Sequence, residues 1–325
     1  MHSVIGGPRQ VLVACAALVL AGQAQAQNYP ARPVRMIVPF SPGGAADVPG
    51  RMLMQKLSEA LGQQVVVDNR PGAGGTIGAD LVAKAPADGY TLLMVSNTHV
   101  ISASLYKKLP YDSLNDFAPV LQFGDAPNVL VVHPSLPVKS VRELVALAKA
   151  KPGSIDYASS GNGSSKHLFA ALFTSLAGVN LTHIPYKGSA QATTDLLSGQ
   201  VTVSFPGIAG MLQHIRNGRL RALAVTSAKR SPQMPEVPSI AGAGVKGYEA
   251  SLWLGILAPA ALPKDINARL NAAASNILKQ PELQKSFRTV GTEIVYRAPE
   301  EFGTFVKSEL GKWARVVKAT GMQVN

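Results

Sequence analysis

The sequence predicts an α/β protein with mostly parallel sheets, and three observations support this fold class. First, short apolar runs alternate with longer amphipathic stretches, which is the order of strands and helices in parallel sheets. Second, two glycine-rich turns, Val38–Asp47 and Tyr157–His167, each follow an apolar run and lead into a helical pattern. Third, the chain has 325 residues, 46% of them hydrophobic, which is enough for two domains of ordinary size.

Residues 1–26 have the features of a cleavable secretory signal peptide. The run Val11–Ala21 is apolar but too short to span a bilayer, and Ala24–Ala26 offers a small-residue cleavage site. Cleavage after Ala26 would also remove Cys15, the only cysteine of the sequence, so we expect no disulfide in the mature chain. The mature protein is therefore expected outside the cytoplasm, most simply in a bacterial periplasm.

The elements of the first half follow from hydrophobic periodicity. Val34–Pro39 is a continuous apolar run and is predicted to be a buried strand. Asp47–Leu61 is predicted to be a helix because apolar residues such as Leu53 and Leu57 recur with helical spacing. The same reasoning predicts strands at Val65–Asp68, Tyr90–Val95, Ala118–Phe123 and Val129–Val132 and helices at Gly75–Ala85 and Val141–Lys151. Residues Gly124–Pro127 are expected to separate the last two of these strands.

The second half repeats the alternation and then becomes helical. We predict strands near Ile155–Ala158 and at Leu181–Ile184, Val201–Phe205 and Leu223–Val225, with a helix at Ser165–Ala177. Prolines crowd together after Lys229 and predict an irregular connector. The C-terminal part is predicted to form helices at Lys264–Gln280, Pro281–Val290 and Pro299–Thr320.

The first glycine-rich turn has the composition of an anion-binding loop. The first N–H groups of a helix lack intrahelical partners, and the helix dipole is positive at that end. Gly43 and Gly44 allow a ligand to approach the backbone closely, and Ser41 can donate its hydroxyl. Asp47 is expected either to cap the following helix or to contribute to the site.

The second glycine-rich turn offers hydroxyls as well as backbone N–H groups. Four serines surround two glycines in this turn: Ser159, Ser160, Ser164, Ser165, Gly161 and Gly163. Such a set can bind a carboxylate without an arginine. His167 lies near the start of the next helix, and we leave open whether it packs, caps the helix or contacts a ligand.

Several other functions find no support in the sequence. The net charge is +12, but the basic residues are scattered, so a nucleic-acid partner is not expected. The sequence has no Gly-x-Ser-x-Gly motif of a serine hydrolase, and the spacing of its glycines near Gly72 misses the dinucleotide-binding fingerprint. Its histidines show no paired spacing for a metal. We therefore expect a binding protein without catalysis, cofactor or metal.

Ordered motifs along nearly the whole mature chain resemble those of the Bug/Tct-type solute-binding proteins of tripartite tricarboxylate transporters. The motifs include Pro39-Phe40-x-Pro42-Gly43-Gly44-x-x-Asp47, Asn69-Arg70-Pro71-Gly72-Ala73-Gly74-Gly75, Asp88-Gly89-Tyr90-Thr91-Leu92, Tyr157-Ala158-Ser159-x-Gly161-x-Gly163-Ser164 and Pro185-Tyr186-Lys187-Gly188. The resemblance implies a two-lobed periplasmic-binding-protein-like fold, or Venus flytrap, in which two segments cross between the lobes. We expect lobe 1 to comprise residues 27–125 and 229–325, and lobe 2 residues 126–228.

The resemblance also implies where the ligand binds. The loop Phe40–Asp47 would hold it from lobe 1 and the loop Ser159–His167 from lobe 2. Asn97 and Thr98 are expected to face the cleft because they end the predicted strand Tyr90–Val95, and Phe205 is expected there because it ends the strand Val201–Phe205.

Family ligands are mostly carboxylates, held by backbone amides, hydroxyls and bridging waters. The family often has an aspartate after the phenylalanine, where this chain has Pro206, and tends to have another at the position of Thr202. Without these acids an amine would lack a partner, so we expect a plain carboxylate rather than an amino acid.

The function that we expect is capture of a small mono-, di- or tricarboxylate by a monomeric protein that delivers it to membrane permease subunits. An alternative is a ligand-binding accessory protein that signals to a membrane sensor kinase. Sequence does not separate the two, because both use ligand-dependent closure of the lobes.

Overall fold

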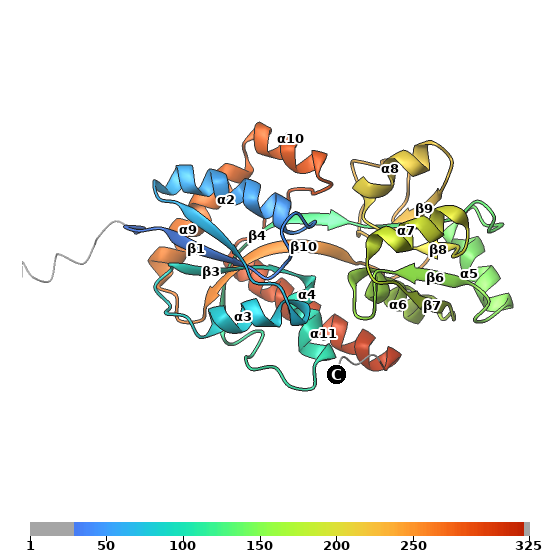
Figure 1. Ribbon diagram of the computed structural model, residues 1–325, viewed down its shortest axis with the longest axis horizontal. Helices are drawn as coiled ribbons and strands as arrows, with labels where there is room; N and C mark the ends of the chain where they lie inside the picture. The colour runs from blue at the N-terminus through green and yellow to red at the C-terminus, as the bar shows by residue number, and fades with distance from the viewer. Residues whose placement is uncertain (1–28, 322–325) are drawn as a thin grey trace, which may run out of the picture.

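The structure is a computed structural model and describes residues 29–321. The predicted signal peptide, residues 1–26, lies outside the described residues. Two lobes lie side by side, each built on a five-stranded sheet with helices packed around it (Figure 1). This arrangement confirms the predicted two-lobed α/β fold.

The sheet of lobe 1 has the strand order β2-β1-β3-β10-β4. Its strands are β1 (Val34–Val38), β2 (Val65–Asn69), β3 (Thr91–Ser96), β4 (Phe117–Pro127) and β10 (Ser251–Pro259). Strand β1 pairs in parallel with β2 and β3, whereas β10 is antiparallel to both β3 and β4. Strand β10 is therefore the one reversed strand of this sheet. The helices are α2 (Asp47–Leu61), α3 (Thr76–Ala83), α4 (Asn97–Leu105), α9 (Lys264–Leu278) and α10 (Pro281–Thr289), and a short 3₁₀ helix, η2 (Ala73–Gly75), precedes α3.

The sheet of lobe 2 has the strand order β7-β6-β8-β5-β9. Its strands are β5 (Val129–Val132), β6 (Asp156–Ser159), β7 (Thr182–Pro185), β8 (Val203–Ser204) and β9 (Arg221–Val225). Strand β6 is parallel to β7 and β8, and β5 is antiparallel to β8 and β9, so this sheet also has one reversed strand. The helices are α5 (Val141–Ala150), α6 (Ser165–Ala177), α7 (Ser189–Ser198) and α8 (Ile208–Arg216).

Two differences from the sequence-based expectation concern the strands near the crossing. Residues Gly124–Pro127, expected to separate two strands, form the end of the long strand β4. Glycine and proline are tolerated there because β4 is an edge strand of its sheet, and the β4–β10 pair has a register shift between Leu254 and Gly255. The run Leu254–Ala258, not predicted as a strand, belongs to the buried strand β10.

The chain passes between the lobes along paired strands. Strand β4 ends at Pro127, and β5 begins at Val129 in the second lobe, so Asn128 alone separates them. The return path runs from β9 through residues 226–250, which form turns, and enters β10. Figure 1 shows β4 and β10 side by side in the middle of the molecule.

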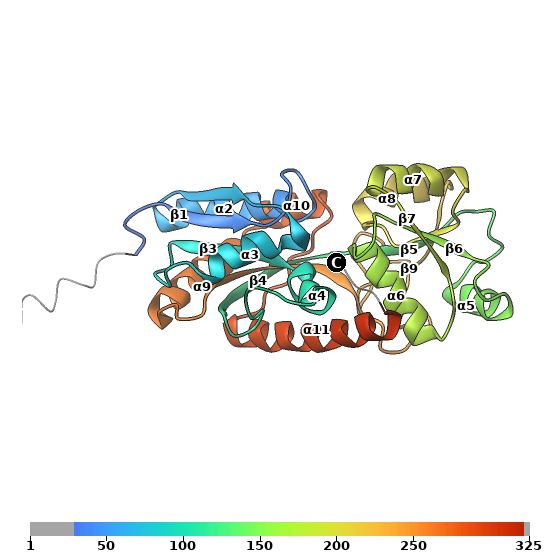
Figure 2. The same cartoon turned by 60° about the horizontal axis from the view of Figure 1, so that its bottom comes forward.

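The helix α11 (Pro299–Thr320) belongs to neither lobe alone. It packs against α4 and β4 of lobe 1 and also against α6 of lobe 2. Figure 2 shows it running beneath lobe 1 and ending beside α6 at the near edge of lobe 2. One buried apolar cluster accordingly contains residues of both sheets together with Trp253 and Trp313.

A buried carboxylate organises this shared core. The indole N–H groups of Trp253 in β10 and Trp313 in α11 both donate to Oε2 of Glu309, each over 3.0 Å. Glu309 is 5% exposed, and its other oxygen forms an ion pair with Lys312. Trp313 stacks on Phe169 of α6 with 6.0 Å between ring centroids. Glu309 thus links the returning strand to the helix that spans both lobes.

We expect Glu309→Ala to lower the free energy of unfolding by roughly 2–4 kcal/mol, because two buried indole N–H groups and a cation lose their acceptor. Urea unfolding followed by tryptophan fluorescence measures this. Glu301→Ala, an exposed acid on the same helix, serves as the control and should cost less than about 1 kcal/mol. An equal loss in both variants would contradict the role assigned to Glu309.

Candidate functional site

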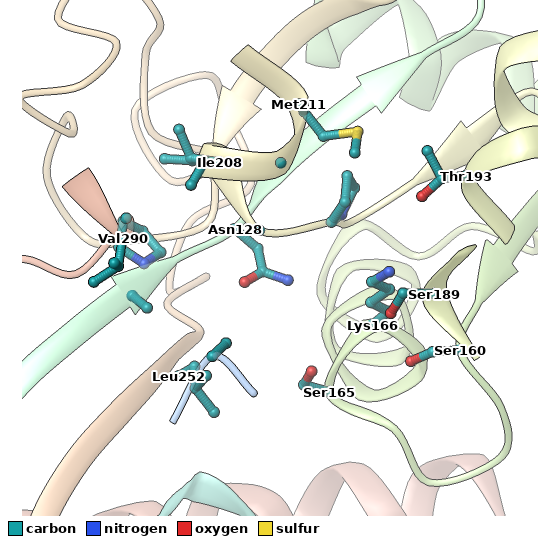
Figure 3. A pocket seen from close by; sticks show the side chains of 18 of the residues that line it. Asn128, Ser160, Ser165, Lys166, Ser189, Thr193, Ile208, Met211, Leu252 and Val290 are labelled. Atoms are coloured by element: carbon teal, nitrogen blue, oxygen red, sulfur yellow. The ribbon is translucent and has the colours of Figure 1, made fainter. Parts of the chain in front are cut away.

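A cavity of about 580 Å³ lies between the lobes (Figure 3). One wall comes from lobe 1 and its crossing strands, the other from the loops and helix starts of lobe 2. The lining residues of the first wall are Ala45, Ala126, Pro127, Asn128, Leu252, Val290 and Gly291. Those of the second wall are Ser160, Ser165, Lys166, Ser189, Ala190, Thr193, Pro206, Gly207, Ile208, Ala209, Gly210 and Met211.

Three helices of lobe 2 begin at this cavity. The first residues of α6, α7 and α8, which are Ser165, Ser189 and Ile208, all line it. None of these helices has an acidic residue in its first turn, and none of the lining residues is Asp or Glu. The positive ends of three helix dipoles therefore face one hollow without a carboxylate of the described chain to neutralise them, which favours an anion.

Four hydroxyls on the lining have no hydrogen-bond partner on the side-chain oxygen within residues 29–321. They belong to Ser160, Ser165, Ser189 and Thr193. Ser189 and Thr193 are one turn apart on α7 and therefore lie on the same face of that helix. These hydroxyls are free to donate to a bound oxygen.

Lys166 is the one charged side chain on the lining. It is the second residue of α6 and is only 9% exposed. Burial lowers the pKa of its amine. The sequence analysis did not select this residue, since a lysine beside a helix start is usually solvent-exposed.

The first glycine-rich turn is held in shape by Asp47, which is 1% exposed. One carboxylate oxygen accepts from the Gly43 N–H over 2.9 Å and from Arg51 Nε over 2.8 Å. The other accepts from Asn69 Nδ2 over 2.8 Å, and the same amide also donates to the Phe40 carbonyl. Burial alone would raise the pKa of Asp47, but these hydrogen bonds outweigh it and lower the pKa. Asp47 lies in the first turn of α2 and holds the loop.

Only part of the first glycine-rich turn lines the cavity. Ala45 lines it, while Ser41, Gly43 and Gly44 belong to the same turn but are not among the lining residues. Phe40 borders a separate hollow of about 10 Å³, together with Thr98.

The second glycine-rich turn is braced by hydrogen bonds of its own. Ser159 is fully buried, and its hydroxyl lies 2.6 Å from His183 Nε2 and accepts from the Gly161 N–H over 3.1 Å. Gly161 has φ +126°, and a Cβ there would lie 3.2 Å from the Tyr186 carbonyl oxygen, so this position requires glycine. Ser164 caps α6 by accepting from the His167 N–H. Within this turn, Ser160 and Ser165 are the serines that reach the cavity.

His167 packs beside the cavity and is not among its lining residues. Its ring stacks on His183 with 3.8 Å between centroids, and its Nδ1 accepts from the Gly163 N–H over 3.1 Å. Burial and the neighbouring His183 lower the pKa of His167 to about 4. The ring is therefore neutral at pH 7, and its proton is on Nε2, because Nδ1 accepts a hydrogen bond.

The remaining expected site residues lie inside lobe 1 or lobe 2. Asn97 begins α4, where a strand end was expected, and is fully buried with both amide atoms unpartnered in the described structure. Thr98 bonds through its hydroxyl to Ser96. Phe205 is fully buried against Phe173, and its carbonyl accepts from Asn128, which does line the cavity.

The sequence analysis missed the contributions of α7 and α8 together with Asn128 and Lys166. Two short signals precede the missed helices, because Gly188 comes before Ser189 and Pro206-Gly207 before Ile208. Each follows a strand of lobe 2, at the same sheet edge as the second glycine-rich turn.

The lobes also touch beside the cavity. Gly291 follows α10 in lobe 1, and a Cβ built on it would lie 2.6 Å from the Cβ of Ala209 in α8. Glycine at this position lets the two lobes approach closely.

Within residues 29–321, no three His, Cys, Asp or Glu side chains gather as a metal site would require. Among the helices described, none combines the length and apolarity needed to cross a membrane.

The buried histidines make stability depend on pH. His167 has a pKa near 4 when folded and about 6.5 when unfolded, so below pH 6.5 the unfolded chain binds a proton that the folded chain does not. Stability is therefore full above pH 6.5 and falls as the pH drops toward 4. We expect His167→Gln to retain about 2 kcal/mol more of its stability than the unsubstituted chain between pH 7.5 and pH 5.

Urea unfolding at the two pH values measures this difference. Substitution of His133, for which the structure shows only local hydrogen bonds to Ser135, serves as the control. The same pH dependence in His167→Gln as in the unsubstituted chain would show that His167 titrates normally in the folded protein.

Comparison with known proteins places the site in context. Residues 50–322 match the model of the tripartite tricarboxylate transporter family receptor, TctC. Protein BugT of Bordetella pertussis is 41% identical over 307 residues, covering 94% of each chain. The structure of R. palustris Rpa4515 with adipate has a TM-score of 0.76 and 38% identity, covering 91% of this chain and 99% of that one. MatC from Rhodopseudomonas palustris with bound malate has a TM-score of 0.73 and 31% identity, covering 89% and 100%.

The family model covers most of the described chain, and the two-lobed fold, the interlobe cavity and these relatives agree with it. The chain belongs to the TctC family of tripartite tricarboxylate transporter receptors, which includes the Bug solute-binding proteins.

Proposed function

We propose that the mature protein is a periplasmic solute-binding receptor that captures a small carboxylate between its lobes and presents it to a tripartite tricarboxylate-type transporter. The observation that carries the proposal is the cavity lining, which combines three helix starts, four unpartnered hydroxyls and a cation with no acidic residue. The adipate and malate bound by two structural relatives support the choice of a carboxylate.

Binding needs no chemistry at this site. Backbone N–H groups at the starts of α6, α7 and α8 and the neighbouring hydroxyls donate to the ligand oxygens. The volume of about 580 Å³ lies within the ordinary range of small-molecule pockets, roughly 300–1,000 Å³, and admits a small acid with bridging waters. A ligand that touches both walls stabilises the arrangement of lobes in which they lie close, and a membrane partner recognises that arrangement.

The lining also favours a plain acid over an amino acid. An ammonium group in the cavity would face helix N-termini and Lys166 and would find no carboxylate on the lining. This agrees with the expectation drawn from Pro206 and Thr202.

We expect residues 27–325 to gain thermal stability from small carboxylates in proportion to the logarithm of ligand concentration, about 2.7 kcal/mol at a hundredfold excess over Kd. A thermal-shift panel of mono-, di- and tricarboxylates measures this, with the corresponding amino acids alongside. Native mass spectrometry of the protein purified from periplasm identifies any acid that remains bound. No shift with any carboxylate, or a stronger shift with aspartate than with its amine-free analogue, would refute this ligand class.

We further expect Gly44→Leu to weaken carboxylate binding at least tenfold while the protein stays folded. Gly44 has an ordinary backbone conformation, but a Cβ there would lie 3.3 Å from the Ser41 carbonyl oxygen, so a branched side chain displaces the first turn. Isothermal titration gives the affinity. Gly311→Leu on α11, where a Cβ would make only an ordinary contact with the end of the Arg315 side chain at 3.7 Å, is the control and should leave the affinity unchanged. Equal affinities in Gly44→Leu, Gly311→Leu and the unsubstituted protein would show that the first turn does not contribute to binding.

A further inference from the structure

Lys166 occupies a position that disfavours a cation in two ways. As the second residue of α6 it lies at the positive end of the helix dipole. It is also only 9% exposed, and removing an ammonium group from water costs free energy unless it is paired. A negative partner would stabilise the charged form of a lysine in this position.

The protein itself supplies none. Within residues 29–321 the Lys166 amine has no hydrogen-bond or ion-pair partner, and its lowered pKa has burial as its cause with no contribution from a neighbouring acid. Seven ion pairs occur elsewhere in the described chain, and each involves a different lysine or arginine. The amine is not among the fully buried unpartnered atoms of residues 29–321, so it reaches the cavity, and a ligand there is the available source of a negative partner.

The side chain is directed into the interlobe cavity. Figure 3 shows Lys166 on α6 and Ser189 on α7 pointing into the hollow, with the Asn128 amide directed toward it from the opposite wall. The unpartnered hydroxyls of Ser189 and Thr193 and the start of α8 line the same space. An ammonium group beside hydroxyls and helix N–H groups is a set of donors suited to the two oxygens of a carboxylate.

We propose that Lys166 binds a second anionic group of the ligand, so that the site selects dicarboxylates over monocarboxylates of the same carbon chain. The proposal rests on the proposed function, since it assumes that the cargo is a carboxylate. One carboxylate lies between Ala45 of the first wall and Ser160 of the second, and the other pairs with Lys166. A monocarboxylate of equal length would instead leave the ammonium group buried and unpaired against a methyl end.

The simplest competing explanation is that the lysine stem is buried while its amine reaches water through the cavity mouth. In that case the amine would make no distinction between ligands. The two explanations differ in how the effect of a substitution at Lys166 depends on the second carboxylate.

The experiment compares two proteins with two pairs of probes by isothermal titration. The proteins are the unsubstituted mature chain and Lys166→Met, which keeps the length of the stem and removes the charge. The probe pairs are adipate with hexanoate and succinate with butanoate, and within each pair only the second carboxylate differs. We expect Lys166→Met to weaken the better-bound dicarboxylate at least tenfold and to change the affinity for its monocarboxylate partner by less than threefold.

Lys187→Met is the matched control. Lys187 is an exposed lysine of the same lobe, outside the cavity lining, so its substitution removes the same charge from the lobe without changing the cavity wall. It should change both affinities by less than threefold. The melting temperature of the ligand-free protein gives a second readout. If Lys166 serves to bind a ligand and does not stabilise the fold, Lys166→Met should melt at or above the temperature of the unsubstituted chain. If Lys166→Met does not fold, Lys166→Gln is tested in the same way.

The outcomes distinguish a failure of this inference from a failure of the proposed function on which it rests. If the unsubstituted protein binds none of the four probes, the proposed carboxylate receptor fails, and the role of Lys166 fails with it. If it binds them and Lys166→Met loses mono- and dicarboxylate affinity equally, or loses neither, the receptor stands and the inference is overturned. A similar loss in Lys187→Met would assign the effect to the general positive field of the lobe, and would likewise overturn it.

Discussion

The antiparallel pairing of β4 and β10 is the constraint on which the rest of the molecule depends. These strands close one edge of the lobe 1 sheet, and their continuations carry the chain to lobe 2 and back. Because the second lobe is inserted between them, its parallel strands end at the cavity together with the starts of α6, α7 and α8. The carboxylate of Glu309 then joins β10 to α11 through two indoles, so the connection between the lobes has a packed core of its own.

The elements that sequence predicted best are those with strong local signals at both ends. Helices α2, α6 and α11 have the predicted bounds, since each has helical periodicity together with a start signal and a glycine just after its end. Helices α7 and α8 were missed because they are short and hold only a few apolar residues against the sheet. Helix α4 was missed because it follows β3 without a loop, so Asn97 was assigned to the end of the strand.

For the candidate site, sequence composition predicted some of the lining residues, whereas the others depend on how distant segments pack. The composition of the two glycine-rich turns indicated anion binding, and Ser160 and Ser165 do line the cavity. The composition did not separate residues that face a ligand from those that hold the loop. Asp47, Ser159 and His167 have their polar atoms engaged within the turns, a fact that depends on partners distant in sequence such as Asn69 and His183. Lys166 was not selected for the same reason, because its place on the cavity lining depends on where α7 and α8 lie around the same hollow.

Helix α11 has a mechanical consequence for any change in the angle between the two lobes. Its 22 residues extend roughly 33 Å, long enough to contact α4 and β4 of lobe 1 and also α6 of lobe 2. Because Trp313 of α11 stacks on Phe169 of α6, such a change would shift one ring across the other unless α11 moved together with lobe 2. The stack therefore couples the position of α11 to that of α6.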